Sequence, residues 1–518
     1  MSRFASALVL ATTFFGTVYG ESQHLFFRVN VSSTLKAPVS GRLLVFLAAG
    51  AGAGDINQSP FDPEPVWVAA KEIQSVEPGS FVAIDTDDIA YPTGFSQVKP
   101  GDYRAQAIVD TNHSYNYFGR DAGDIRSEVV SLPDFRPENT AQPVLTLSSV
   151  IPSSPPVALA SGIKEEDFVS PALSRFYGRP THIRALVVPP PNYMNYPGPA
   201  HPANRYAAVY YTQGFGGSLD LSRSDATTFA RLMEHKKIPE MFWILLDESL
   251  PTGTHEFADS VNNGPWGEAL TKEFIPYLEH RYRLEPRAGA RFLNGHSSGG
   301  WATLWLQVNY PKIFGGTWST SPDPVDFHNF TGINLYAPNA NVFHCGQGPC
   351  PIVREQGRVI ATVEQFAHLE ETLGPYGGQF ASFEWVFSPR GPDGRPLEMF
   401  DRTTGNVNAD VVHYWQRYDI ANVIQTHWQQ LTPNLQGKIH IYVGTADTFY
   451  LDGAVHRLDT LLQSLGARAK IQFLTGRTHM NVYEVGNDPH GLFLQIAAEM
   501  YAAWQAGAKP MAPMRSGN

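Results

Sequence analysis

The heptapeptide Asn294–Gly300 constrains the possible fold of this chain more than any other segment. It reads Asn-Gly-His-Ser-Ser-Gly-Gly, with Ser297 at the centre of a Gly-x-Ser-x-Gly pattern, an apolar strand pattern before it and a helical pattern after it. Glycines two positions before and after the serine allow a strand and a helix to pass closely without a Cβ clash. The pattern predicts a sharp turn that presents the Ser297 hydroxyl at a helix N-terminus, where backbone N–H groups favour a developing oxyanion.

The flanking sequence alternates strand patterns with helical patterns from about residue 166 onward, which is typical of a doubly wound, mainly parallel sheet. We expect strands at 206–211, 242–246, 290–293, 316–318, 438–443 and 471–474, and helices at 268–282, 298–310, 453–465 and 489–504. The fold class predicted for residues 176–510 is α/β, with an α/β-hydrolase sheet. Residues 322–430 have no counterpart in a minimal sheet of this kind, and so long an insertion predicts a cap beside the active site.

Residues 21–155 have a different pattern, with short strand-like segments separated by turn residues and no convincing helix between them. Strand patterns occur at 26–31, 42–47, 79–84, 101–109 and 144–147. This spacing predicts an N-terminal antiparallel β-sandwich of the immunoglobulin-like type. Sequence rich in proline and serine follows, and we place the interdomain linker at residues 156–175.

Residues 1–20 have the features of a signal peptide. Arg3 supplies a positive charge, residues 5–17 are apolar or small, and residues 18–20 offer a cleavage site. A buried N-terminal strand is the alternative. A signal peptide predicts a secreted or periplasmic protein, and no later segment is apolar for long enough to predict a membrane span. The formal charge of −11 argues against nucleic acid as a partner, since an acidic surface repels phosphates.

The chain has two cysteines, Cys345 and Cys350, in the sequence Cys-Gly-Gln-Gly-Pro-Cys. A structural zinc ion needs three or four ligands, and beyond His344 nothing nearby supplies them, so we expect no metal site. In an oxidising compartment two thiols at this spacing are expected to form a disulfide. Closing so short a loop contributes about 2 kcal/mol, so this bond is expected to hold a loop and not the whole fold.

A serine hydroxyl needs a general base, and the base needs a carboxylate to orient it. In the predicted fold these follow the serine in the order Asp or Glu, then His, on loops after later strands. Asp447 lies just past the strand predicted at 438–443, and His479 lies just past the next one. Asp452 and His490 are the rival candidates, but Asp452 suits a helix N-cap and His490 lies in the first turn of the closing helix.

The oxyanion of the reaction needs two backbone donors. We expect one from the N–H of Ser298, directly after the nucleophile, and the other from the N–H of Phe215 in the loop Gly214–Gly217. The polar segment 255–266 follows a strand end, so Trp266 and Asn263 are tentative substrate-binding residues. An ordinary loop is an equally good interpretation of that segment.

The region from about 180 to 505 resembles one branch of the α/β-hydrolases, the putative esterases, in several motifs. The matching segments are Val187–Tyr193, Gly214–Gly217, Gly295–Gly300, Tyr310–Gly315, Gly444–Phe449 and Gly476–His479. This branch includes enterochelin esterases, esterase D (S-formylglutathione hydrolase) and secreted acetylxylan or feruloyl esterases. The resemblance implies a Ser297, Asp447 and His479 triad, and the N-terminal β-sandwich resembles that of enterochelin esterases. The insertion 322–430 and Gln213, where histidine is common, depart from the pattern and leave the substrate open.

These observations together predict a secreted serine hydrolase that cleaves a carboxylic ester through an acyl-enzyme intermediate, with no cofactor. The expected substrate is a small-molecule, siderophore or carbohydrate ester. Two alternatives remain open. A serine peptidase can use the same fold because the triad also cleaves amides, and a hydrolase-like domain can serve as a non-catalytic binding protein.

Overall fold

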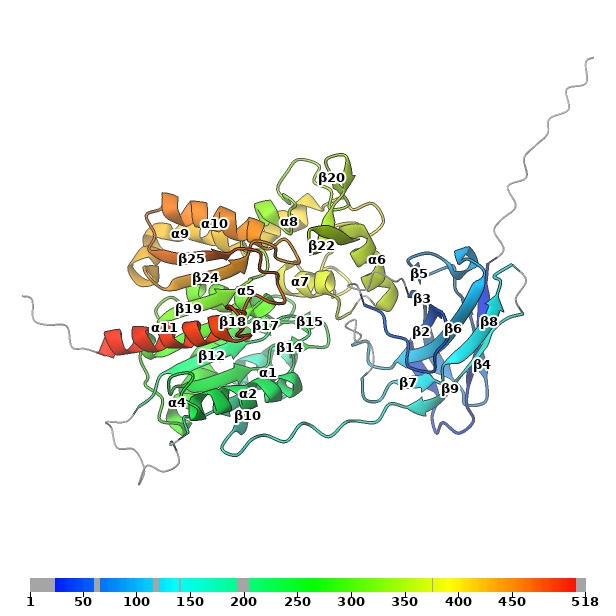
Figure 1. The fold of residues 1–518 in the computed structure, drawn as a ribbon, viewed down its shortest axis with the longest axis horizontal. Helices are drawn as coiled ribbons and strands as arrows, with labels where there is room; N and C mark the ends of the chain where they lie inside the picture. The colour runs from blue at the N-terminus through cyan, green and yellow to red at the C-terminus, as the bar shows by residue number, and fades with distance from the viewer. Residues whose placement is uncertain are drawn as a thin grey trace, which may run out of the picture.

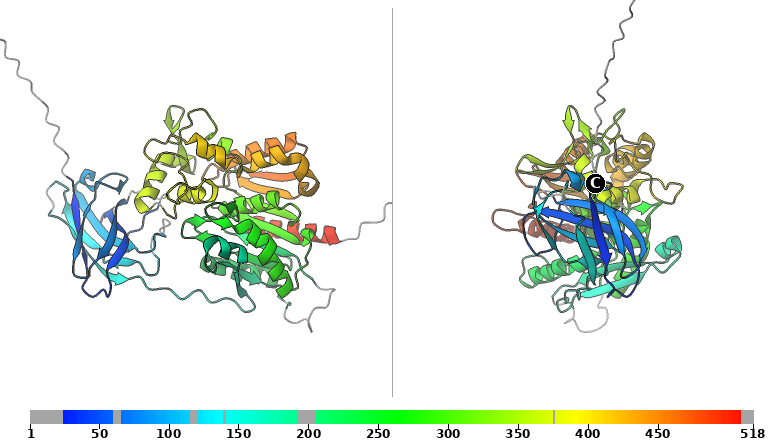
Figure 2. Two further views of the ribbon diagram at one scale, coloured as in Figure 1. Left: turned by 180° about the vertical axis from the view of Figure 1, so that it is seen from behind. Right: turned by 90° about the vertical axis from the view of Figure 1, so that its right-hand side faces the viewer.

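The computed structural model describes residues 24–59, 66–114, 121–138, 141–191, 193, 205–374 and 376–508. It contains two large β-sheets, one formed by the N-terminal part of the chain and one by the remainder, with an insertion beside them (Figures 1 and 2). The signal peptide predicted at residues 1–20 lies outside the described residues. Among the described helices, none combines the length and the apolar character that a membrane crossing needs.

The N-terminal sheet has nine strands in the order β4-β1-β9-β7-β6-β2-β3-β5, with β8 beside β6. Strands from both ends of this order share one apolar core, which includes Phe27, Val45 and Leu145 and supports the predicted β-sandwich. The prediction of a purely antiparallel sheet is wrong in one pairing, because β1 and β9 run parallel. Their bounds are β1 (Phe26–Val31), β2 (Val39–Ala49), β3 (Trp67–Val76), β4 (Phe81–Asp85), β5 (Ala90–Tyr91), β6 (Gly101–Asp110), β7 (Ile125–Ser127), β8 (Val130–Phe135) and β9 (Val144–Val150).

The second sheet has eight strands in the order β10-β11-β13-β12-β18-β19-β24-β25. All neighbouring pairs are parallel except those of β11, which runs against the others. The carboxyl ends of the parallel strands therefore meet at one edge of the sheet. The bounds are β10 (Lys164–Val169), β11 (His182–Val188), β12 (Ala208–Thr212), β13 (Phe242–Leu246), β18 (Arg291–His296), β19 (Gly316–Thr320), β24 (Ile439–Gly444) and β25 (Ala469–Leu474).

Helices cover both faces of this sheet because successive side chains of its central strands point to opposite faces. Val209 and Trp243 lie in the apolar core that also contains residues of α2 and α11, whereas Tyr210 and Ile244 lie in the core on the other face. The helices are α1 (Pro171–Tyr177), α2 (Leu219–Glu234), α3 (Trp266–Ala269), α4 (Ile275–Arg281), α5 (Ser298–Asn309), α9 (Ile420–Leu435), α10 (Asp452–Ser464) and α11 (Gly491–Ala508), with a π-helical turn, η3 (Leu270–Phe274), between α3 and α4.

Ordered structure of the second sheet begins earlier than the sequence indicated. Strand β10 and most of α1 lie inside residues 156–175, the range that the sequence assigned to a linker. Strand β10 has the charged sequence Lys-Glu-Glu-Asp-Phe-Val, which does not have the apolar pattern of a buried strand. This sequence suits its place at the edge of the sheet, where it pairs with β11 on one side only and its outer side chains remain exposed.

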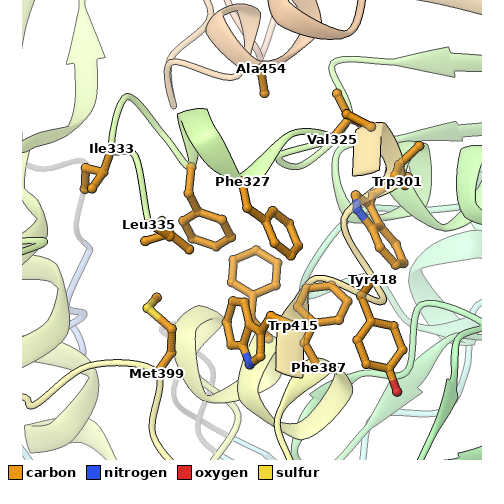
Figure 3. Packing of buried hydrophobic residues seen from close by; sticks show 14 of the residues in the cluster. Trp301, Val325, Phe327, Ile333, Leu335, Phe387, Met399, Trp415, Tyr418 and Ala454 are labelled. Carbon is orange, nitrogen blue, oxygen red and sulfur yellow. The ribbon is translucent and has the colours of Figure 1, made fainter. Parts of the chain in front are cut away.

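The insertion between β19 and β24 shares an apolar core with the second sheet and is not a detached lid. Its aromatic residues Phe327, Phe387 and Trp415 pack in the same apolar cluster as Trp301 of α5 (Figure 3). Ring centroids of Phe387 and Trp415 lie 5.3 Å apart. The elements of the insertion are η5 (Phe327–Asn329), β20 (His344–Cys345), β21 (Gly348–Pro349), β22 (Pro351–Glu355), β23 (Arg358–Thr362), α6 (Val363–Leu373), α7 (Gln379–Phe387) and α8 (Ala409–Trp415).

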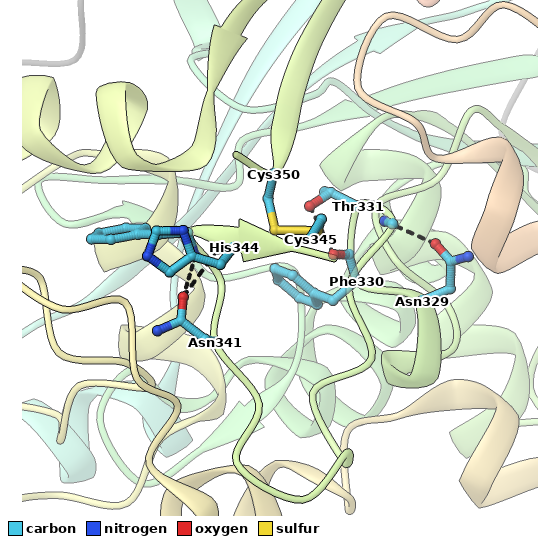
Figure 4. Close-up of a disulfide and its surroundings, with 9 residues drawn as sticks. Asn329, Phe330, Thr331, Asn341, His344, Cys345 and Cys350 are labelled. Atoms are coloured by element: carbon cyan, nitrogen blue, oxygen red, sulfur yellow. Dashed lines mark hydrogen bonds between the residues drawn. A yellow bond between two sulfur atoms is a disulfide. The ribbon is translucent and has the colours of Figure 1, made fainter. Parts of the chain in front are cut away.

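The Cys345–Cys350 disulfide closes the small β20–β21 hairpin within the insertion (Figure 4). Cys345 is exposed and Cys350 is buried. The Cys350 N–H donates to the Phe343 carbonyl, and the side-chain oxygen of Asn341 accepts from the N–H of His344. The bond therefore ties an exposed turn to the buried core of the insertion.

Strand β2 of the N-terminal sheet contacts the insertion through helix α6. Leu44 and Phe46 pack in one apolar cluster with Leu369 and Leu373. The buried guanidinium of Arg42 donates to the Thr372 carbonyl at 3.1 Å through Nε, and to the Glu371 carbonyl at 2.7 Å through Nη2. Carbonyl groups at a helix C-terminus lack partners within the helix and favour a cation, so Arg42 caps α6 from the other domain.

We expect Arg42→Met to lower the free energy of unfolding by about 1 to 3 kcal/mol, because the carbonyls that end α6 lose their donors. Urea unfolding followed by tryptophan fluorescence measures the change. Lys36→Met, at an exposed cation of the same domain, is the control and is expected to change stability by less than about 0.5 kcal/mol. Equal stability of the Arg42→Met variant and the unaltered protein would contradict this account of the interface.

Candidate active site

Ser297 occupies the turn between strand β18 and helix α5. Its backbone has φ 58° and ψ −127°, a conformation that costs an ordinary residue about 1 to 3 kcal/mol. The Ser297 N–H donates to the Thr320 carbonyl of neighbouring strand β19 at 3.0 Å, and its carbonyl accepts from the Trp301 N–H at 3.0 Å. These bonds hold the strained turn, and Ser297 itself remains partly exposed.

The glycines around Ser297 are required because backbone atoms fill the space that a Cβ would take. A Cβ on Gly295 would lie 2.1 Å from the Gly299 carbonyl oxygen. A Cβ on Gly299 would lie 2.1 Å from the carbonyl oxygen of Gln213, in the loop after β12. No side chain fits at such distances, so the strand, the helix and this loop can meet only where these residues are glycine.

Asp447 and His479 come together at the carboxyl edge of the sheet. Asp447 follows the end of β24, and His479 follows the end of β25, the neighbouring strand. The Nδ1 atom of His479 lies 2.9 Å from Oδ2 of Asp447, within hydrogen-bond distance. Both side chains are buried.

The surroundings of Asp447 favour its ionised form. Burial acts to raise the pKa of this carboxyl, but the adjacent His479 and the backbone N–H groups of Phe449 and Leu451 outweigh burial and lower the pKa. The Phe449 N–H donates to Oδ1 at 2.9 Å. Asp447 can therefore hold the His479 ring in one orientation and stabilise its protonated form.

The structure separates these two residues from their rivals. Asp452 begins α10 and forms an ion pair with Arg354, whose Nη2 lies 2.9 Å from Oδ1. His490 is exposed, and its backbone N–H donates to the Asp488 side chain. The structure records neither Asp452 nor His490 as a hydrogen-bond partner of His479 or Asp447 in the described part of the chain.

His296, the residue directly before Ser297, lies next to His479. The ring of His296 lies 4.4 Å from the ring of His479, centroid to centroid. Burial, together with the nearby His479, lowers the pKa of His296 to about 3, so this ring is neutral beside the pair. No hydrogen bond joins the Ser297 hydroxyl to His479 among the described residues. Such bonds are often long before a substrate binds.

The loop after β12 lies directly against Ser297. A Cβ on Gly214 would lie 2.8 Å from the Ser297 Cβ, and the Gly217 N–H closes a turn by donating to the Gly214 carbonyl at 2.9 Å. Phe215 lies within this turn. Ser298 is the first residue of α5, whose first backbone N–H groups have no acceptor inside the helix. The two residues predicted as oxyanion donors thus lie on the two segments that flank the serine.

Trp266 and Asn263 belong to a different feature. The Trp266 indole is buried, stacks on His255 and donates to the Asn263 carbonyl at 2.7 Å. Trp266 and Asn263 line a cavity of about 270 Å³ together with Arg184 and Trp385, and none of Ser297, Asp447 and His479 lines it. The structure therefore groups the two tentative substrate-binding residues with that cavity and not with Ser297.

Asp323 is a neighbour of Ser297 whose contacts the sequence left unassigned. It follows the end of β19, and its Oδ2 atom accepts a 2.5 Å hydrogen bond from the Ser298 hydroxyl. Burial raises the pKa of Asp323 to about 6, although its hydrogen bond with Ser298 acts to lower that pKa. Its position just after a parallel strand is the signal in the sequence that could have pointed to it.

One group of side chains among the described residues has the spacing of metal ligands. The ligand atoms of Asp326, His328 and Asp419 lie within 4.8 Å of one another. The guanidinium of Arg457 already donates to Asp326 at 2.9 Å, and the Tyr336 hydroxyl donates to Asp419 at 2.8 Å. The cation of Arg457 thus occupies one side of this group.

Comparison with known families and structures gives the following. A family model described as "Putative esterase" matches residues 179–507, more than half of the chain. Curated protein sequences give no significant match. Similar solved structures include a ferulic acid esterase (11% identity, 67% of this chain and 100% of that chain, TM-score 0.41) and an S-formylglutathione hydrolase from Agrobacterium tumefaciens (11%, 68% and 98%, TM-score 0.39). A ferulic acid esterase from Anaeromyces mucronatus, in complex with ferulic acid, shows 14% identity over 67% and 94% of the chains, with TM-score 0.35.

We expect Gly299→Ala to lower the free energy of unfolding by about 3 kcal/mol or more and to abolish hydrolysis, because its Cβ collides with backbone atoms that cannot move separately. Thermal unfolding and ester hydrolysis measure the two effects. Gly54→Ala is the control, since a Cβ there has open space around it, and its stability is expected to stay within about 0.5 kcal/mol. A stable, active Gly299→Ala variant would show that the turn is looser than described.

Proposed function

Because this chain belongs to the Putative esterase family and is a carboxylic ester hydrolase, we propose that Ser297, His479 and Asp447 form its catalytic triad. The observation that carries the proposal is the 2.9 Å hydrogen bond between His479 and Asp447 at the sheet edge where the Ser297 turn also lies. Three loops that follow three different parallel strands supply these side chains, the arrangement that a serine hydrolase requires.

The proposed reaction passes through an acyl-enzyme intermediate. Nε2 of His479 accepts the proton as the Ser297 oxygen attacks the ester carbonyl carbon, and the same proton then goes to the leaving alcohol. Asp447 stabilises the imidazolium that exists between these two transfers. Water, deprotonated by His479, attacks the acyl-enzyme and releases the acid, with Ser297 regaining its proton.

The negative charge that develops on the carbonyl oxygen needs donors that are already in place. We assign this role to the backbone N–H groups of Ser298 and Phe215. Ser298 supplies the N–H at the start of α5, and the Phe215 turn lies against the serine. Loss of one such donor typically costs about 3 kcal/mol in the transition state.

The proposal includes a small-molecule ester as substrate, with siderophore and carbohydrate esters as the two classes to be compared. It also places the protein outside the cytoplasm, either secreted or periplasmic. The Cys345–Cys350 disulfide supports this location, because disulfides persist in oxidising compartments.

Ser297→Ala is expected to reduce hydrolysis of p-nitrophenyl acetate by up to about 10⁶-fold and to prevent labelling by a fluorophosphonate, because the attacking oxygen is absent. Ser464→Ala, at an exposed serine of α10, is the control and should retain both properties. Hydrolysis of peptide anilides at rates comparable with the ester would favour a peptidase. Failure of the unaltered protein to label or to hydrolyse esters would favour a binding protein.

A second pair of variants tests the choice of acid. Asp447→Asn is expected to lower kcat by about 10⁴-fold, because the amide no longer stabilises the protonated imidazole. Asp452→Asn is expected to change kcat less than about tenfold, since Asp452 pairs with Arg354 and not with His479. Steady-state rates on p-nitrophenyl acetate measure both, and the opposite order of effects would reassign the acid.

A further inference from the structure

Asp323 contacts the nucleophile turn through both its backbone and its side chain. The Asp323 N–H donates to the Ser297 carbonyl at 3.3 Å, and its Oδ2 accepts the 2.5 Å hydrogen bond from the Ser298 hydroxyl. The side chain is buried, with a residue exposure of 6%. Asp323 therefore contacts both Ser297, to which we assign the attack, and Ser298, to which we assign oxyanion stabilisation.

Helix α7 of the insertion, the segment predicted as a cap, contacts the same carboxyl group. Gln379 is the first residue of α7, and its Nε2 lies 3.4 Å from Oδ2 of Asp323. The start of α7 is held in turn by Glu370 of α6, which accepts from the backbone N–H of Gln379 and, at 3.1 Å, from that of Phe380. Asp323 thus has the nucleophile turn on one side and an anchored cap helix on the other.

The ionisable groups around Asp323 come from three loops. The loop after β13 supplies the buried carboxyls of Glu248 and Glu256, and the loops after β24 and β25 supply Asp447 and His479. Burial acts most strongly to raise the pKa of Asp323, and the nearby Asp447 adds to it. The hydrogen bonds from Ser298 and Ser297 and the charge of His479 act in the opposite direction.

Glu248 and Glu256 differ from Asp323 in their contacts. Burial raises the pKa of both groups well above the usual value, which favours their neutral forms. Neither carboxyl has a recorded hydrogen bond to the nucleophile turn among the described residues. Of the three buried carboxyls, Asp323 is the one that touches Ser298.

We propose that Asp323 is a positioning residue of this active site, which fixes the Ser297–Ser298 turn and, through Gln379, ties that turn to the cap. This inference rests on the proposed function, because the turn matters only if Ser297 attacks and the Ser298 N–H stabilises the oxyanion. Because Asp323 contacts both α7 and Ser298, a shift of α7 changes the alignment of the Ser298 N–H.

Removal of the anchor is tested with Asp323→Ala. The expected result is a fall in kcat for p-nitrophenyl acetate of about 10- to 100-fold with little change in KM, because a misaligned donor weakens transition-state binding more than substrate binding. Gln379→Ala should give a smaller fall in the same direction. Asp326→Asn is the matched control, a buried carboxylate from the same loop that contacts Arg457 and not the nucleophile turn, and its kcat should stay unchanged.

Asp323→Asn separates positioning from simple structural support. Its amide oxygen can still accept from the Ser298 hydroxyl, so kcat at the optimum pH should recover to within about threefold of the unaltered protein. The amide carries no negative charge and so stabilises protonated His479 less. The acid limb of the pH profile of kcat/KM should therefore move to lower pH, by about one unit or less.

Two results would overturn the inference. One is an Asp323→Ala variant with unaltered kcat, and the other is an Asp323→Asn variant with the unaltered pH profile and no recovery of kcat over Asp323→Ala. Ser297→Ala is measured in the same series. An active Ser297→Ala variant would contradict the proposed function. An inactive Ser297→Ala variant together with a fully active Asp323→Ala variant would contradict the positioning role alone.

Discussion

The backbone turn at Ser297 is the constraint on which the rest of the second domain depends. Strand β18, helix α5 and the loop after β12 meet there at distances that exclude any Cβ on Gly295, Gly299 or Gly214. In this crowded turn Ser297 adopts a positive φ, and its backbone hydrogen bonds with Thr320 and Trp301 maintain that conformation. Parallel strands on either side of β18 then place the carboxyl ends of β19, β24 and β25 along the same edge of the sheet.

The insertion extends this arrangement into the N-terminal domain through a series of local contacts. Arg42 of β2 caps the end of α6, Glu370 of α6 holds the start of α7, and Gln379 of α7 reaches Asp323. Each contact places a buried charged side chain, Arg42, Glu370 or Asp323, against polar groups of the next element. The aromatic core shared with α5 adds a second, apolar connection between the insertion and the nucleophile helix.

Much of the candidate site could be predicted from local sequence. That Asp447 and His479 lie close together could be predicted because each follows an apolar strand and the carboxyl ends of neighbouring parallel strands meet at one edge. Trp266 and Asn263 also follow a strand end, and they line a cavity that none of Ser297, Asp447 and His479 lines, so their role as substrate-binding residues stays a prediction. The contacts of Asp323 could not be predicted from local sequence, because Gln379, which reaches its carboxyl, comes from a helix of the insertion far along the chain.

The sequence by itself determined the features that depend on short spacings: the glycine-flanked serine turn, the alternation of strands and helices, and the disulfide between Cys345 and Cys350. Only the tertiary structure decided the parallel pairing of β1 with β9, the inclusion of β10 in the second sheet, and the contact of α6 with Arg42. Spacing, glycine conformation and periodicity act within a few residues and leave a readable pattern. Pairing between distant segments depends on which surfaces remain to be covered once each local element has formed, and no local pattern records that choice.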